Sequence, residues 1–419
     1  MTGDATRTLS RNRDARRARF EALLVSMALA GNNGASYLVT VIAARLLVPA
    51  VFGEFSSLFA VLVIGVVPAM GLQTVVALRV ARAESQGARL REAGSLLSLG
   101  LTTSAAVTTA AFALAPVLVA LLYLDTAAPA LWLAASLAPL TLLGLFHGLL
   151  QGTRRFAALA VLISLEGVGK IGGTLTGLLL FRSSEGALAG AAIGSLAVAT
   201  TGWLICGRPR PVAGGVRHAT EVLHAAQAMF ALVLLVNVDL VLARHHLPPD
   251  EAGGYAIGAV ITKIAYWLPQ AVGVVVLPRM AHAEDRGRAV PIALAVCAGL
   301  DAVVVAGCVL LESTVVGLVG GAGFASIDLA VWPFALAGSF LALAQILLFS
   351  RIASADRRST ALVWAAVALE IVLVTGWLHG STGQVVTAAV VSTCALTTIG
   401  GLIEYLRGRA ARSARGSRA

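Results

Sequence analysis

Ionisable side chains inside apolar runs are the first candidates for chemistry in this sequence. They are the acids Glu166, Asp239, Asp301 and Glu370 and the bases Lys170 and Lys263. A charge in the middle of a membrane helix costs about 2.5–3.5 kcal/mol to insert, so it persists where it is paired or faces water. Deep carboxylates can also exchange H+ or bind Na+, which leaves an ion-coupled cycle open without choosing the ion.

Three polar or aromatic residues with helical spacing form the clearest candidate binding stripe. Lys263, Trp267 and Gln270 are four and three residues apart, so on a helix they share one face. An ammonium group suits a pyrophosphate and an aromatic ring suits the face of a sugar. The stripe therefore predicts contact with an anionic glycolipid, although snorkelling and helix packing would use the same residue types.

Two further groups of polar residues lie in the first half of the chain. Glu166 and Lys170 are four residues apart, so on a helix they would neutralise each other and either ease insertion or line a cavity. Asn33 falls near the middle of the first apolar run, where an amide more often bridges helices than binds a ligand.

Two arginines are candidates for an electropositive outer cavity. Asn237 and Arg244 are seven residues apart and share a helix face, and Arg45 occupies the position in the first half that matches Arg244. Snorkelling of both arginines to the outer headgroups explains the same pattern equally well.

The composition requires a membrane to position these residues. Hydrophobic residues make up 58% of the 419 positions, charged residues 12%, and the mean hydropathy is +0.87. A spanning helix takes about 20 apolar residues, and the apolar runs predict an all-α polytopic membrane protein of about twelve transmembrane helices. The predicted spans are 22–48, 54–78, 93–121, 130–150, 156–181, 187–206, 223–247, 254–278, 289–311, 329–350, 359–378 and 384–405.

The second half of the sequence repeats the first. ARLLVPAVFGEF at 44–55 parallels ARHHLPPDEAGGY at 243–255, and Pro68 matches Pro269. Paired prolines in equivalent helices indicate a transport site, so both are hinge candidates. Six spans separate equivalent points, which predicts two six-helix lobes related by a parallel pseudo-two-fold repeat. The predicted parts are a basic N-terminal tail (1–19), an N-lobe (20–206), an inter-lobe loop (207–222), a C-lobe (223–405) and a basic C-terminal tail (406–419).

The basic residues are distributed unevenly between the connections. Of the 31 Lys and Arg residues, 26 fall in the tails and in alternate connections, which would all lie on one side of the membrane. By the positive-inside rule both termini are cytoplasmic. The net charge of +10 is therefore explained by topology, and we expect no nucleic-acid partner.

Three stretches carry a resemblance to a known family. VNVDLVLARHHLPPDEAGGYAIGAVITKIAYWLPQAVGVVVLPRMA at 236–281, AARLLVPAVFGEFSSLFAVL with GLQTVVALRVA within 43–81, and GLLQGTRRF at 148–156 resemble polysaccharide biosynthesis flippases. These belong to the multidrug/oligosaccharidyl-lipid/polysaccharide (MOP) exporter superfamily, which includes the MATE transporters. The resemblance implies a flippase of the bacterial cytoplasmic membrane that moves undecaprenyl-pyrophosphate-linked oligosaccharides by alternating access. Lys263 would contact the pyrophosphate. Implied partners are membrane lipids, H+ or Na+, and polysaccharide polymerase or glycosyltransferases.

Two other classes of function stay open. The first is an ion-coupled drug or small-molecule antiporter of the same superfamily, or a major-facilitator carrier, although 79–91 lacks the G-x-x-x-D-R motif of the latter. The second is a membrane glycosyltransferase or ligase, which the short outer stretches disfavour. GVGK at 167–170 lacks the flanking residues of a nucleotide loop, so we expect neither an enzyme nor a cofactor.

Overall fold

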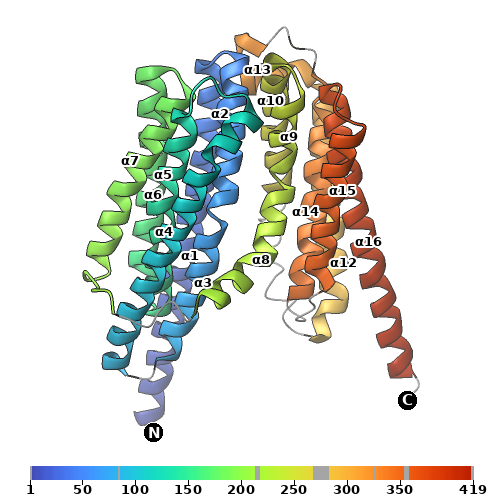
Figure 1. The fold of residues 1–419 in the computed structure, drawn as a ribbon. Helices are drawn as coiled ribbons and strands as arrows, with labels where there is room; N and C mark the ends of the chain where they lie inside the picture. The colour runs from blue at the N-terminus through green and yellow to red at the C-terminus, as the bar shows by residue number, and fades with distance from the viewer. Residues whose placement is uncertain are drawn as a thin grey trace. The chain divides into compact units, whose positions relative to one another are not determined.

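The computed structural model describes residues 2–83, 85–212, 218–267, 283–324, 327, 329–352 and 358–416. Throughout these residues the chain forms helices and short connections, with no strand (Figure 1). The chain is therefore an all-α membrane protein, as the hydropathy pattern predicted.

The helices reproduce the predicted spans. In the described residues eight helical stretches are long and apolar enough to cross a membrane, and two shorter apolar helices cover Trp332–Leu348 and Thr360–Gly376. The two remaining predicted spans, 22–48 and 254–278, coincide with parts of α1 (Thr2–Leu46) and α10 (Pro249–Trp267). Asn32 and Asn33 reduce the hydropathy of α1, and residues 268–282 lie outside the described residues. The chain is thus polytopic, and eight of the predicted spans coincide with described stretches that are long and apolar enough to cross a membrane.

The described chain divides into two compact units that do not follow a single cut in the sequence. Unit 1 comprises Met1–Leu46 and Gly65–Met229, and unit 2 comprises Leu47–Ile64 and Phe230–Ala419. The predicted lobe boundaries differ from this division, because the predicted N-lobe contained residues 47–64 and the predicted C-lobe began at 223.

Unit 1 is built from helices of the first half. They are α1, α3 (Val67–Arg82), α4 (Gln86–Leu122), α5 (Ala128–Gly152), α6 (Phe156–Phe181), α7 (Ser184–Ile205) and the first turns of α8 (Ala219–Leu235). Helix α5 packs against α3, α4 and α7, and α6 packs against α1 and α7. The start of α7 is capped by Ser183, whose hydroxyl accepts a hydrogen bond from Gly186 N at 3.1 Å.

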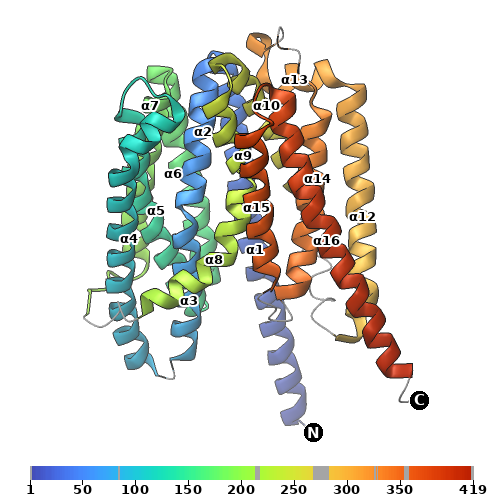
Figure 2. The same cartoon turned by 45° about the vertical axis from the view of Figure 1, so that its right-hand side comes forward.

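Unit 2 contains one helix from the first half and the helices of the second. They are α2 (Pro49–Gly65), the end of α8, α9 (Val238–His246), α10, α12 (Ala283–Leu310), α13 (Glu312–Gly320), the 3-10 turn Ala322–Phe324, α14 (Trp332–Ile352), α15 (Arg358–Gly376) and α16 (Thr382–Gly416). Helix α14 packs against α10, α12 and α16 (Figure 2). A hydrophobic core cluster of unit 2 includes Leu235, Tyr266, Leu341 and Val367.

The repeat found in the sequence recurs as a local structure. Helix α1 ends at Leu46, and after two residues Pro49 begins α2. Helix α9 ends at His246, and again two residues separate it from Pro249 at the start of α10. Proline is favoured in a first helical turn because its missing N–H would have no partner there.

Helices α2 and α10 approach closely within unit 2 at a pair of repeat-equivalent glycines. A methyl group added to Gly53 would lie 2.9 Å from the backbone nitrogen of Gly253. One added to Gly253 would collide with the carbonyl of Pro49. Only glycine permits this approach, so these residues hold α2 against the second half of the chain.

Candidate functional site

A buried acidic cluster in unit 2 consists of Asp239, Tyr255, Lys263, Glu370 and Ser392, contributed by α9, α10, α15 and α16. The Tyr255 hydroxyl donates to Asp239 Oδ2 at 2.9 Å, and the Ser392 hydroxyl donates to Glu370 Oε2 at 2.9 Å. Both carboxyl groups are buried, and they interact electrostatically with each other. The Lys263 ammonium group interacts electrostatically with Asp239.

A break in the seventh predicted span positions Asp239. Helix α8 ends at Leu235, and α9 starts at Val238, so Asp239 occupies the first turn of a new helix. The Asn237 side chain donates to Val233 O at 2.8 Å in the interruption between these helices. Such discontinuous helices expose backbone groups, and they commonly build ion and substrate sites in transporters.

When both acids are ionised, the acidic cluster holds two negative charges, from Asp239 and Glu370, and one positive charge, from Lys263. Asp239 Oδ1 and Glu370 Oε1 are buried and accept no hydrogen bond from the residues that the structure describes. Leaving such atoms without a partner in a low-dielectric interior is costly. The arrangement can therefore take up a proton or a monovalent cation with oxygen ligands.

Two members of the predicted binding stripe are described. Lys263 and Trp267 are both half-buried, one turn apart on α10. The Trp267 ring packs on the core of unit 2 and makes an edge contact with Tyr266, with ring centroids 5.7 Å apart. Gln270 and the hinge candidate Pro269 lie outside the described residues. The structure thus adds Asp239 as a neighbour of Lys263.

The other hinge candidate lies at a helix boundary. Pro68 is in the first turn of α3, directly after α2 ends at Gly65. The division between the compact units falls at the same place, between Ile64 and Gly65. The hinge role of Pro68 stays a prediction, and its position is suited to it.

Arg244 contacts protein groups that the sequence had not suggested. It is buried, with Nη2 3.8 Å from Glu54 Oε2 and Nη1 donating to Ala50 O at 3.4 Å. Both partners belong to α2, so Arg244 fastens α9 to that helix. Its repeat-mate Arg45 is exposed at the end of α1. The two arginines therefore have different surroundings, and their role in an outer cavity stays a prediction.

Glu166 has a different close partner from the one predicted. In the part of the chain that the structure describes there is no ion pair between Glu166 and Lys170. Instead, Glu166 Oε2 lies 3.6 Å from Nε2 of His147 on α5. Asn33 is half-buried on α1, and the neighbouring amide of Asn32 reaches α6 beside Gly167. Sequence spacing finds neighbours along one helix, whereas His147 comes from another helix.

A double glycine zipper positions α6 and its polar residues. Gly169, Gly173 and Gly177 on α6 face Gly194, Gly190 and Gly186 on α7, and added methyl groups would meet the opposing backbone carbonyls. Both helices carry the G-x-x-x-G-x-x-x-G spacing that allows membrane helices to approach closely. This signal was present in the sequence and was missed.

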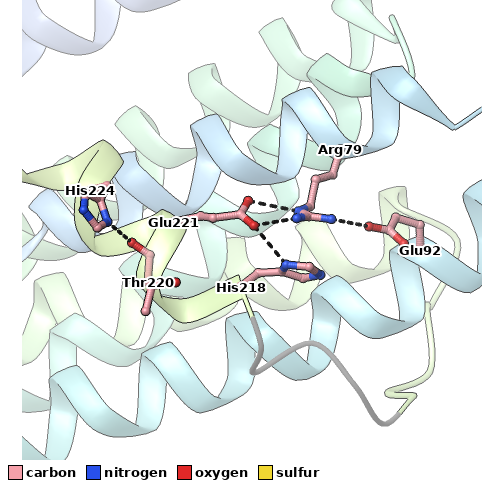
Figure 3. A network of polar contacts seen from close by, with 6 residues as sticks. All are labelled: Arg79, Glu92, His218, Thr220, Glu221 and His224. Carbon is pink, nitrogen blue, oxygen red and sulfur yellow. Dashed lines mark hydrogen bonds and ion pairs between the residues drawn. The ribbon is translucent and has the colours of Figure 1, made fainter.

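A polar network anchors the predicted inter-lobe loop to unit 1 (Figure 3). Arg79, in the last turn of α3, donates from Nη2 to Glu221 Oε1 at 2.6 Å and from Nε to Glu221 Oε2 at 3.2 Å. Its Nη1 lies 3.6 Å from Glu92 on α4, and Nδ1 of His218 lies 3.1 Å from Glu221 Oε1. The paired hydrogen bonds with Arg79 hold the pKa of the Glu221 carboxyl below its usual value.

The chain before this network also lies against α4. Val212 N donates to Gly94 O at 3.0 Å, and the Ser98 hydroxyl donates to Val212 O at 2.7 Å. An added methyl group on Gly94 would lie 2.7 Å from Val212 Cγ2. The described parts of the predicted loop 207–222 therefore belong to unit 1.

The His, Cys, Asp and Glu side chains of the described residues are spread over several helices. No group of three or more His, Cys, Asp or Glu side chains there is arranged to hold a metal ion. The buried polar groups described above are the acidic cluster, the Arg244–Glu54 pair and the His147–Glu166 pair.

Comparison with solved structures defines the class of fold. The chain is similar to the lipid II flippase MurJ in an inward closed conformation, with a TM-score of 0.73, 13% identity, and coverage of 90% of this chain and 86% of that one. It is equally similar to an inward-facing multidrug resistance MATE transporter, with a TM-score of 0.73, 14% identity, and coverage of 91% and 96%. A MOP superfamily transporter from Pyrococcus furiosus gives a TM-score of 0.58, 15% identity, and coverage of 93% and 96%. The fold is that of the MOP superfamily.

The family follows from a sequence comparison. The model of the family described as polysaccharide biosynthesis protein matches residues 21–284, and the chain belongs to this family. None of the curated proteins compared matches the chain. The predicted family is confirmed, and so is the predicted fold.

Proposed function

We propose that this protein is a flippase that moves lipid-linked oligosaccharides across a membrane for polysaccharide biosynthesis. The observation that carries the proposal is the family match over residues 21–284. A fold shared with a lipid II flippase supports it, since that fold accommodates transport of a lipid carrying a saccharide. Undecaprenyl pyrophosphate is the proposed lipid carrier, and transport proceeds by alternating access.

The setting proposed for this activity is the bacterial cytoplasmic membrane, with both termini in the cytoplasm. The uneven distribution of Lys and Arg supports this orientation. In that arrangement, cytoplasmic glycosyltransferases supply the substrate and a polymerase acts on it after transport.

The acidic cluster is the proposed site of energy coupling. Asp239 and Glu370 together hold one more negative charge than Lys263 balances, so binding of H+ or Na+ would neutralise the cluster. Lys263 is half-buried, and it is the proposed contact for the substrate pyrophosphate. A pyrophosphate that pairs with Lys263 would compete with Asp239 for its ammonium group, which links substrate binding to ion binding.

A reconstituted flipping assay tests the proposal. The purified protein is placed in liposomes that contain a fluorescent polyprenyl-pyrophosphate saccharide, and dithionite bleaches the label exposed in the outer leaflet. We expect the wild-type protein to make the inner-leaflet label accessible, and Lys263→Gln to slow this by about tenfold, as expected from loss of one charged contact. The matched control Lys263→Arg keeps the charge and should keep most of the rate.

Two outcomes separate the parts of the proposal. If wild-type protein flips neither the labelled saccharide lipid nor one with a shorter prenyl chain, the flippase assignment fails. If Lys263→Gln flips as fast as wild type, only the assignment of Lys263 fails. Repeating the assay with Na+ or pH gradients identifies the coupling ion.

An ion-coupled small-molecule antiporter is the second candidate function. The likeness to a MATE transporter favours it, and so does the presence of the buried acids Asp239, Asp301 and Glu370 in unit 2. Acidic residues suit a cationic substrate, whereas a pyrophosphate needs Lys263. Exchange of a fluorescent organic cation by the same liposomes, without flipping of the saccharide lipid, would favour this function.

A further inference from the structure

A second group of buried polar side chains lies in unit 1, separate from the acidic cluster. His147 on α5 and Glu166 on α6 approach to 3.6 Å between Nε2 and Oε2. Asn32 on α1 contacts α6 at the next residue, because a methyl group added to Gly167 would lie 3.0 Å from Asn32 Oδ1. Three helices thus contribute polar atoms to one region of unit 1.

His147 is poorly satisfied in this region. Its side chain is only 9% exposed, and Nε2 accepts or donates no hydrogen bond among the described residues. Asn32 Oδ1 is likewise buried without a hydrogen-bond partner. A buried polar atom without a partner is uncommon and costly, so its retention requires an explanation.

A proton is the ligand that fits the geometry. A neutral imidazole with its proton on Nδ1 presents a lone pair from Nε2 and repels a carboxylate oxygen, and one with its proton on Nε2 offers a neutral N–H group. An imidazolium carries N–H groups on both nitrogens and a positive charge, so it attracts the Glu166 carboxylate more strongly than either neutral form. Adding one proton to Nε2 forms one N–H bond and no other bond changes. The resulting cation can then donate a charge-assisted hydrogen bond to Glu166 Oε2 after a small approach.

The other charged side chains on α6 and on the helices packed against α5 do not face His147 as Glu166 does. Lys170 is one turn from Glu166 on α6. The remaining described charges on the helices packed against α5 lie near helix ends: Arg79 and Arg82 on α3, Arg91 and Glu92 on α4, and Glu185 on α7. Glu166 is therefore the charge that faces His147 within the apolar part of unit 1.

We infer that His147 and Glu166 form a proton-binding site in unit 1, in which a proton on His147 Nε2 is held by the Glu166 carboxylate. This site goes beyond the proposed function, since it needs neither the saccharide substrate nor the acidic cluster. It gives unit 1 its own response to pH, because the interaction between α5 and α6 changes from a weak contact to an ion pair when the proton binds.

Hydrogen–deuterium exchange at the imidazole C2 position tests the inference on the purified full-length protein. The exchange rate depends on whether the ring is protonated, and mass spectrometry follows each histidine separately. We expect the His147 rate to change with pH through a single titration midpoint. In Glu166→Gln this midpoint should move to lower pH by about 1 unit or more, the effect of removing an opposite charge within about 4–6 Å.

Two controls make the result specific. Exchange at His224 is an internal reference, because this residue is exposed and bonds to Thr220 O at 2.7 Å, and its midpoint should not move. Lys170→Gln, one turn from Glu166, removes a cation instead of an anion and should not move the His147 midpoint to lower pH. An unchanged His147 midpoint in Glu166→Gln, or a wild-type His147 whose exchange rate shows no titration, would overturn the inference. The wild-type titration needs no substitution, and a flippase failure in liposomes would leave this result untouched.

Discussion

At the residue scale, the buried charged side chains that have a close polar partner in the described residues contact a residue of another helix. Glu166 lies beside His147, Arg244 beside Glu54, and Asp239 accepts a hydrogen bond from Tyr255. The reason is energetic, since the bilayer makes an unpaired charge expensive while packed helices bring partners together from anywhere in the sequence. Paired charges therefore act as cross-links between helices as well as candidate sites.

The Arg79–Glu221 pair gives a pH prediction at this scale. The pKa of Glu221 is lowered by its hydrogen bonds to Arg79, so the pair contributes stability above the usual carboxyl pKa and loses it as pH falls through the lowered value. We expect Glu221→Gln to lower the melting temperature at pH 7 by at most about 2 °C, because the pair is partly exposed. The difference from wild type should vanish in acid.

Thermal unfolding of the detergent-purified protein at several pH values measures this effect. Asp125→Asn is the control, because Asp125 is an exposed acid in the connection before α5, and its removal should leave the pH dependence intact. A Glu221→Gln variant whose difference from wild type persists equally at pH 7 and in acid would contradict the role of the ion pair.

At the element scale, the zipper between α6 and α7 sets how closely these helices pack. A side chain at Gly173 would collide with the carbonyl of Gly190, whereas one at Gly172 would meet nothing within 4 Å. We expect Gly173→Leu to separate the helices and destabilise the protein by about 1–3 kcal/mol, the cost of overpacking. Gly172→Leu on the same helix is the matched control and should unfold at nearly the wild-type temperature. Equal melting temperatures for the two variants would show that the zipper does not hold the helices together.

The positions of the membrane-spanning helices could be predicted from the hydropathy of the sequence, but the breaks within them could not. Long apolar runs gave the spans, because burial of apolar surface in lipid depends mainly on composition. The break before Asp239 was missed, since it contains no proline or glycine. The hydrogen bond at the break is local, from the Asn237 side chain to Val233 O. Lys263 was found as a deep base, but its neighbour Asp239 lies 24 positions earlier, beyond any spacing rule for one helix.

At the scale of the whole molecule, α2 belongs to the first half of the sequence but to the same compact unit as the helices of the second half. Gly53 packs on Gly253, Glu54 pairs with Arg244, and the Ser57 hydroxyl approaches Leu240 O at 3.4 Å. An internal repeat predicts a cut between the halves, but it does not determine which helix packs with which unit. These contacts show that residues 47–64 belong with the second half.

This grouping predicts which distances stay constant during transport. Spin labels at Val48 and Val391, both exposed and both in unit 2, should give the same distance distribution with and without Na+ and at different pH values. Labels at Phe112 in unit 1 and Val391 in unit 2 should give a distribution that changes, because alternating access moves repeat units as rigid bodies. Pulsed electron spin resonance on variants lacking the four native cysteines measures both pairs. If the Val48–Val391 distance changed as much as the Phe112–Val391 distance, α2 would move with the first half of the chain, and the contacts at Gly53 and Glu54 would have to break in each cycle.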